Sequence, residues 1–123
     1  MMNVVLVGHC TPDAFMLKGM VDRVLPGAAV HSINDDESLS DHYGEESVWL
    51  VNRILDGAFA VGQSGMDLIE SRVKGLPGAK VLLISDLEEH QANAEKLGAH
   101  PGFGKKGLYD ETAADRLRQV AGH

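Results

Sequence analysis

The stretch Ser47–Gly57 reads SVWLVNRILDG, and it indicates how the chain is built. Four apolar residues, Val48 to Val51, run directly into the polar Asn52. A short apolar run bounded by polar residues is typical of a strand that is buried on both faces of a parallel sheet. In α/β sheets, ligands and chemistry collect where such strands end. The chain places an amide at this position, where a carboxylate would be the more reactive group.

Apolar runs alternate with segments of helical periodicity along the rest of the chain. Such alternation predicts an α/β fold in which a doubly wound, five-stranded parallel sheet is covered by helices on both faces. This is a flavodoxin-like three-layer sandwich, formed as one domain over residues 1–123. We expect strands at Val4–Val7, Ala28–Ile33, Val48–Asn52, Lys80–Ser85 and Gly102–Lys105, and helices after an N-cap at Thr11, over Asp35–Tyr43, around Met66–Val73, over Leu87–Leu97 and from Asp110.

Length and charge restrict the classes of function. With 123 residues and a net charge of −7, the chain is not expected to bind nucleic acid phosphates without regard to sequence. No apolar run approaches the roughly 20 residues that cross a bilayer, and the N-terminus lacks the pattern of a signal peptide. The single cysteine, Cys10, excludes an internal disulfide and fits a reducing compartment. We therefore expect a cytoplasmic protein without membrane contact.

The segment Lys80–Leu117, KVLLISDLEEHQANAEKLGAHPGFGKKGLYDETAADRL, carries several motifs in a distinctive order. A strand ends in a hydroxyl residue, a helix closes on Leu-Gly-Ala, and Gly-Phe precedes lysine ahead of an amphipathic helix. The preceding GMDLI, residues 65–69, fits the start of a helix in the same arrangement. Together these pieces resemble the receiver domains of bacterial two-component response regulators. The resemblance covers nearly the whole chain and implies a signalling domain.

The resemblance also implies that the phosphorylation chemistry is missing. In the family, the third strand ends in the aspartate that accepts a phosphoryl group, and Asn52 stands at that position. An acidic pair after the first strand holds Mg²⁺ in the family, and Gly8 and His9 stand there instead. An amide is a poor nucleophile, and Mg²⁺ prefers carboxylate oxygens. We therefore expect a degenerate receiver that has no metal and no cofactor.

Other positions match the family pattern. Ser85 corresponds to the hydroxyl that reads the phosphorylated state. If Phe103 is the family's switch aromatic, Lys106 is its lysine. Counting from the preceding helix end selects Lys105 instead, because the chain has one extra residue around Pro101. Both lysines remain candidates on the sequence alone.

Asp86 departs from the family, which has a small residue beside the hydroxyl. A carboxylate there repels an incoming phosphate and is able to pair with a lysine. The hypothesis that follows is a permanent hydrogen-bonded cluster of Ser85 and Lys106 with Asn52 and Asp86.

A second reading places a metal or an enzyme site at the strand ends. His9, Asp86 and His90 are zinc-ligand types, but no close-spaced ligand pair supports a metal site, so structural roles are expected. Cys10 lies just before a helix N-terminus, which lowers a thiol pKa. A phosphatase-like nucleophile needs an arginine six residues later, where Met16 stands. A small-ligand or enzymatic flavodoxin-like domain using His9, Cys10, Asp86 and His90 is therefore the alternative.

The preferred interpretation is a non-enzymatic module that acts through protein–protein contact without phosphorylation. In the family, the fourth helix, fifth strand and fifth helix form the usual output and dimer surface. By resemblance, that surface spans Glu88 to Val120 here. We expect it to bind a signalling protein or to mediate self-association as a dimer.

Overall fold

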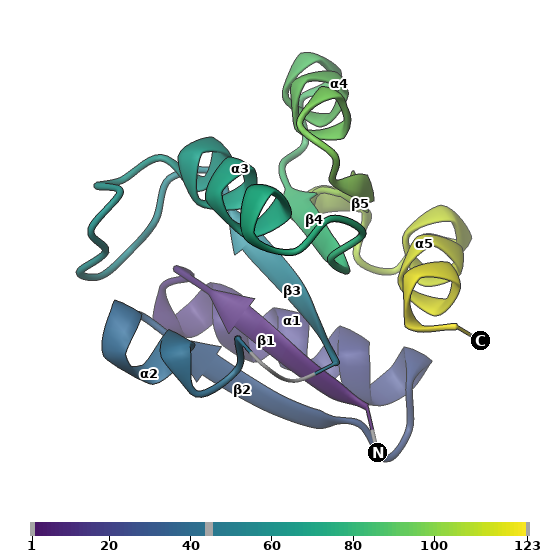
Figure 1. The fold of residues 1–123 in the computed structure, drawn as a ribbon. Coiled ribbons are helices and arrows are strands. Elements are labelled where there is room, and N and C mark those ends of the chain that lie inside the picture. The colour runs from purple at the N-terminus through teal and green to yellow at the C-terminus, as the bar shows by residue number, and fades with distance from the viewer. Residues whose placement is uncertain (1, 44–45, 123) are drawn as a thin grey trace.

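A computed structural model describes residues 2–43 and 46–122 of the chain. Strands and helices alternate along it, as the sequence predicts (Figure 1). The strands are β1 (Asn3–Val7), β2 (Ala29–Ile33), β3 (Ser47–Asn52), β4 (Val81–Ile84) and β5 (His100–Phe103). The helices are α1 (Thr11–Val24), α2 (Asp36–Ser40), α3 (Gly65–Gly75), α4 (Glu88–Lys96) and α5 (Glu111–Ala121), with a short 3₁₀ turn, η1 (Lys105–Gly107), before α5.

The strands form one five-stranded parallel sheet in the order β2-β1-β3-β4-β5. Helices cover both of its faces, so the three-layer α/β fold predicted from the sequence is confirmed. Within the described residues, no helix is long and apolar enough to reach across a bilayer.

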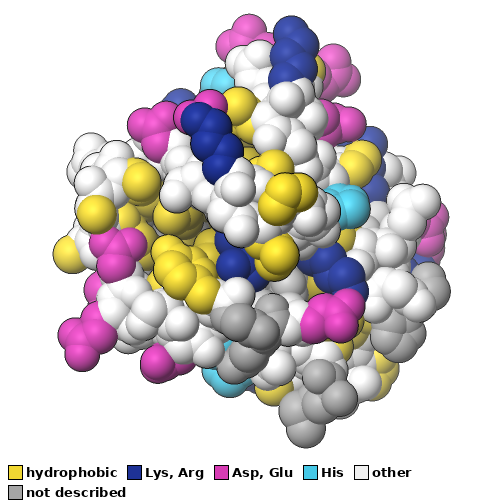
Figure 2. All heavy atoms as spheres, in the orientation of Figure 1, with side chains coloured by type: hydrophobic (Ala, Val, Ile, Leu, Met, Phe, Trp, Pro, Cys, Tyr) yellow, Lys and Arg dark blue, Asp and Glu magenta, His cyan; other side chains and the backbone are white. Residues whose placement is uncertain are grey.

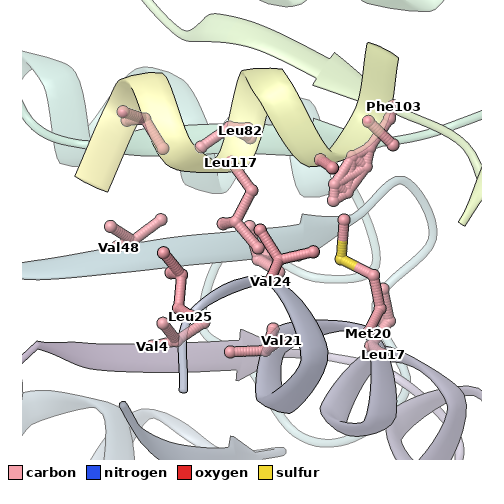
Figure 3. Packing of buried hydrophobic residues seen from close by; sticks show 14 of the residues in the cluster. Val4, Leu17, Met20, Val21, Val24, Leu25, Val48, Leu82, Phe103 and Leu117 are labelled. Atoms are coloured by element: carbon pink, nitrogen blue, oxygen red, sulfur yellow. The ribbon is translucent and has the colours of Figure 1, made fainter. Parts of the chain in front are cut away.

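Two apolar clusters sandwich the sheet because successive strand residues point to opposite faces. On one face, Val4, Val48 and Leu82 pack against α1 and α5 (Figure 3). On the other face, Trp49 and Val51 pack against α2, α3 and α4. The central strands are therefore buried on both sides, which fixes where their polar ends emerge.

Several predicted boundaries differ from the structure, and the helix expected over Asp35–Tyr43 is the shorter α2, Asp36–Ser40. Helix α1 begins at Thr11 with Cys10 as its N-cap, so Thr11 is the first helical residue and not the cap. Strand β5 covers His100–Phe103 and not Gly102–Lys105. The sequence Pro101-Gly102 looks like a turn, but proline is tolerated in β5 because this is an edge strand and its missing N–H leaves no ladder bond broken.

A β-bulge in β5 accounts for the extra residue near Pro101. The register pairs Leu82 with His100 and Ile84 with Phe103, so two steps along β4 correspond to three along β5. Such a bulge leaves one residue outside the regular ladder. The backbone groups of that residue need other partners.

The Gln91 side chain supplies those partners from α4. Its Oε1 accepts a hydrogen bond of 3.1 Å from the Gly102 backbone N–H. Its Nε2 donates to the carbonyl oxygens of Leu83, at 2.9 Å, and Ser85, at 3.0 Å. Arg116 of α5 donates to the Gly102 carbonyl. A Cβ atom on Gly102 would lie 2.1 Å from the Leu83 oxygen, so only glycine fits this bulge.

Candidate functional site at the carboxyl end of the sheet

The carboxyl ends of the four strands β1, β3, β4 and β5 bring the predicted site residues to one rim of the sheet. Gly8 and His9 follow β1, and Asn52 is the last residue of β3. Ser85 and Asp86 follow β4, while Lys105 begins η1 after β5.

The Asn52 side-chain amide joins two backbone segments through hydrogen bonds. Its Nδ2 donates to the carbonyl oxygen of Gly8 at 2.9 Å and to that of Ile54 at 2.8 Å. Its Oδ1 accepts a hydrogen bond of 3.5 Å from the Lys105 ammonium. A carboxylate has no N–H to donate, so an aspartate in this geometry would place an oxygen against two carbonyl oxygens. The pocket is therefore shaped around an amide.

Lys105, and not Lys106, brings its ammonium into the pocket. The Lys105 Nζ lies 2.7 Å from Asp13 Oδ2, in addition to its contact with Asn52. This hydrogen bond is the main cause that lowers the pKa of the Asp13 carboxyl below its usual value. Asp13 comes from the first turn of α1, and the sequence signalled it only as an acid favoured by the helix dipole. The pocket cation is thus already neutralised from within the chain.

Gly8 is held where a larger residue does not fit. Its φ is +75°, a left-handed conformation that disfavours side chains. A Cβ atom would lie 2.6 Å from a side-chain carbon of Leu55 and 3.1 Å from its Cα. An acidic residue at this position would require Leu55 to move.

His9 turns into the protein interior. The residue is 2% exposed, and its Nε2 donates to the Leu50 carbonyl at 2.8 Å. Burial is the main cause that lowers the pKa of His9 to about 4, against the opposing effect of the Leu50 hydrogen bond. The imidazole is therefore neutral at pH 7, and its Nδ1 has no hydrogen-bond partner in the structure.

Ser85 and Asp86 make other contacts than the cluster expected from the sequence. Ser85 Oγ lies 3.0 Å from His90 Nδ1, and it accepts from the Leu87 backbone N–H at 3.3 Å. Asp86 Oδ1 accepts from the Lys106 backbone N–H at 3.1 Å, and not from a lysine ammonium. The cluster expected from the sequence is therefore not formed among the described residues: Asp86 meets only the backbone N–H of Lys106, and the ammonium on Asn52 is that of Lys105.

The residues of the alternative reading are held apart in different surroundings. His9 is directed at Leu50, while His90 contacts Ser85. Cys10 is the partly buried N-cap of α1 and makes no side-chain capping bond there. Across residues 2–43 and 46–122, no three His, Cys, Asp or Glu side chains are grouped so that they could hold a metal ion.

Phe103, the expected switch aromatic, is buried against α1 and α5 (Figure 3). It lies two residues before Lys105, where the family spacing is three by our alignment. The bulge in β5, opposite Leu82 to Ile84 of β4, ends at Phe103, immediately before this shortened spacing.

No protein-family model matches the chain, and no curated protein does so either. Solved structures resemble it along its whole length. The response regulator receiver protein from Pseudoalteromonas atlantica matches with a TM-score of 0.73 at 15% identity, over 98% of this chain and 97% of the other. The receiver domain of NtrX from Brucella abortus gives a TM-score of 0.65 at 23% identity, over 98% and 94%.

A third similar structure is a response regulator from Burkholderia pseudomallei with a phosphorylated aspartic acid, a calcium ion and citrate. Its TM-score is 0.64 at 22% identity, over 98% of this chain and 71% of the other. At such identities the likeness shows a shared fold. The chain therefore has the fold of response regulator receiver domains, as the sequence resemblance implies.

Proposed function

We propose that the chain is a degenerate receiver: a signalling module that works through protein–protein contact and takes up no phosphoryl group at Asn52. The observation that carries the proposal is the use of both amide hydrogens of Asn52. They donate to the Gly8 and Ile54 carbonyls, so the side chain performs a structural task that a phosphoacceptor carboxylate could not.

The charges of the rim support the same conclusion. Phosphoryl transfer depends on a nucleophile and on cations that neutralise the transferred group. Here the carboxylate nearest Lys105 is Asp13, and it is engaged with that lysine at 2.7 Å. Gly8 cannot carry an acid without displacing Leu55, and His9 is a buried neutral imidazole. The groups that would bind Mg²⁺ in the family pattern are thus replaced by groups with other roles.

The hydrogen bonds of Gln91 and Arg116 to the bulge in β5 favour a single arrangement of α4, β5 and α5. Gln91 ties α4 to both β4 and β5, and Arg116 ties α5 to the Gly102 carbonyl. A receiver that switches needs a two-state element that its input can bias. With Ser85 bound to His90 and the bulge held by side chains, this region is proposed to present one constant surface.

The surface from Glu88 to Val120 is the proposed contact face, for a signalling protein or for self-association. Tyr109, which lies within it, is 85% exposed. A cavity of about 440 Å³ opens between α4 and α5 in the same face, with Glu88, Glu95 and Asp110 among its lining residues. Contact through a surface needs no catalytic group, so the module is proposed to be non-enzymatic. It is also proposed to act in the cytoplasm, a reducing compartment that suits its single cysteine.

Incubation with acetyl phosphate and Mg²⁺ tests the proposal, with intact-protein mass spectrometry as the readout. The wild-type chain and Asn52→Asp are both expected to keep their mass, because the acidic pair is absent in both. A receiver with the full acidic set serves as the positive control. A mass gain of one phosphoryl group on the wild-type chain would contradict the proposal and identify another acid as the acceptor.

A further inference from the structure

A second cavity lies away from the strand-end rim, between the end of α2 and helix α3. Its volume is about 350 Å³, and it is lined by Trp49 of β3, by Leu68, Ser71, Arg72 and Leu76 along α3 and its C-cap, and by Tyr43 after α2. Figure 2 shows hydrophobic side chains gathered between α2 and α3, beside a basic side chain. We name these six residues the α3 groove.

Arg72 is the charged group of the α3 groove, and it lies over two aromatic rings, Trp49 and Tyr43, that stack on each other. Its guanidinium carbon lies 4.2 Å from the centre of the Trp49 ring and 5.6 Å from that of Tyr43. Its Nη1 donates to the Tyr43 carbonyl at 3.0 Å. Burial lowers the pKa of the guanidinium, which nevertheless stays protonated. In the part of the chain that the structure describes, no carboxylate forms an ion pair with it.

The remaining N–H groups of Arg72 are therefore open to an anion from outside the chain. A guanidinium fork matches the two oxygens of a carboxylate. The groove lies at the C-terminal half of α3, where the helix carbonyls oppose any anion, and they oppose a doubly charged phosphate more strongly than a singly charged carboxylate. Tyr43 and Leu76 are 48% and 45% exposed and offer an aromatic and an aliphatic surface to the uncharged part of a ligand. A singly charged carboxylate attached to a ring satisfies all these groups.

We propose that the α3 groove binds a small aryl carboxylate, with its oxygens on Arg72 and its ring beside Tyr43 and Leu76. The cavity volume of about 350 Å³ lies within the range of small-molecule sites, roughly 300–1,000 Å³, and is small for a folded partner. Trp49 stands three residues before Asn52 on β3, roughly 10 Å along the strand. The α3 groove is thus separate from the strand-end rim, and this inference does not depend on the proposed function.

Titration with phenylacetate tests the proposal, with Trp49 as the reporter. Trp49 is the single tryptophan of the chain, so its fluorescence reports on this groove. We expect a saturable change with phenylacetate. The neutral phenylacetamide should bind about tenfold more weakly or worse, because it lacks the charge that pairs with the guanidinium. Acetate, which has no ring, should also bind more weakly.

Two variants separate binding at Arg72 from non-specific effects. Arg72→Met should weaken phenylacetate binding about tenfold, whereas Arg53→Met, at an exposed arginine elsewhere, should not change it. Arg72→Lys retains the charge without the fork, and it should give an intermediate loss. Circular dichroism verifies that each variant is folded, and methyl chemical shifts of Leu68 and Leu76 give a second readout. Absence of saturable binding to the folded wild type, or equal affinity for phenylacetamide, would overturn the proposal.

Discussion

Replacing Gln91 by alanine should destabilise the domain by the loss of the bulge contacts. The side chain makes three hydrogen bonds, to Leu83, Ser85 and Gly102, in a partly buried setting. At about 1 kcal/mol each, their loss lowers the free energy of unfolding by roughly 3 kcal/mol. With an unfolding entropy of about 2.1 cal/mol/K per residue, the melting temperature of a 123-residue domain falls by roughly 12 °C.

Urea titration and thermal melting, followed by circular dichroism, measure this change. Asn93→Ala is the matched control, because Asn93 carries an amide on the exposed side of the same helix. Gln91→Glu keeps the acceptor for the Gly102 N–H but removes both donations, so it should lose most of the same stability. If Gln91→Ala and Asn93→Ala were equally stable, the bulge would not depend on the Gln91 side chain. The proposal that α4, β5 and α5 present one constant surface would then lose its support.

Three further predictions concern the rim. The pKa of His9 is about 6.5 in the unfolded chain and about 4 in the folded protein, so the unfolded chain takes up the proton first as the pH falls. The free energy of unfolding should therefore decrease by about 3 kcal/mol as the pH falls from 6.5 to 4, and in urea titrations His9→Gln should flatten this dependence. Lys105→Met should raise the pKa of the Asp13 carboxyl in an NMR titration, whereas Lys106→Met should leave it unchanged; equal effects would mean that the wrong lysine has been placed in the pocket. Gly8→Ala should lower the free energy of unfolding by roughly 2–4 kcal/mol, because of the positive φ and the contact with Leu55. The control Gly19→Ala, in open space on α1, should raise it by about 0.5–1 kcal/mol. Melting experiments in which Gly8→Ala leaves the stability unchanged would refute the steric reasoning.

The parallel sheet and its layers were predictable because they follow from hydrophobic runs. Val48–Val51 and Val81–Ile84 are apolar for long enough to require burial on both faces, and the helices between them leave a parallel sheet as the consistent arrangement. Strand β5 was predicted to begin at Gly102 but begins at His100, because Pro101 is a turn residue in most settings and does not indicate a strand. The observed strand includes both Pro101 and Gly102. Their place in a strand depends on Gln91, which lies in another element.

The rim was predicted at the level of positions and not of contacts. Parallel topology places strand ends together, so Asn52 and a lysine near residue 105 were expected to meet. The partner of that lysine, Asp13, is 92 residues away in the chain, and no local pattern encodes the pair. The contact of Ser85 with His90 likewise depends on how α4 packs against the sheet. The spacing of residues along the sequence does not determine that packing.

The packing of Leu55 over Gly8 couples the choice of residue at position 8 to the packing of the core. Placing an acid at position 8 requires a smaller residue in place of Leu55, which is 2% exposed in the core beside α3. Trimming such a leucine to alanine typically costs 2–5 kcal/mol, a large share of the stability of a small domain. A single substitution that places a carboxylate at position 8 therefore also strains the core, so a change at this edge of the sheet is coupled to the stability of the whole domain.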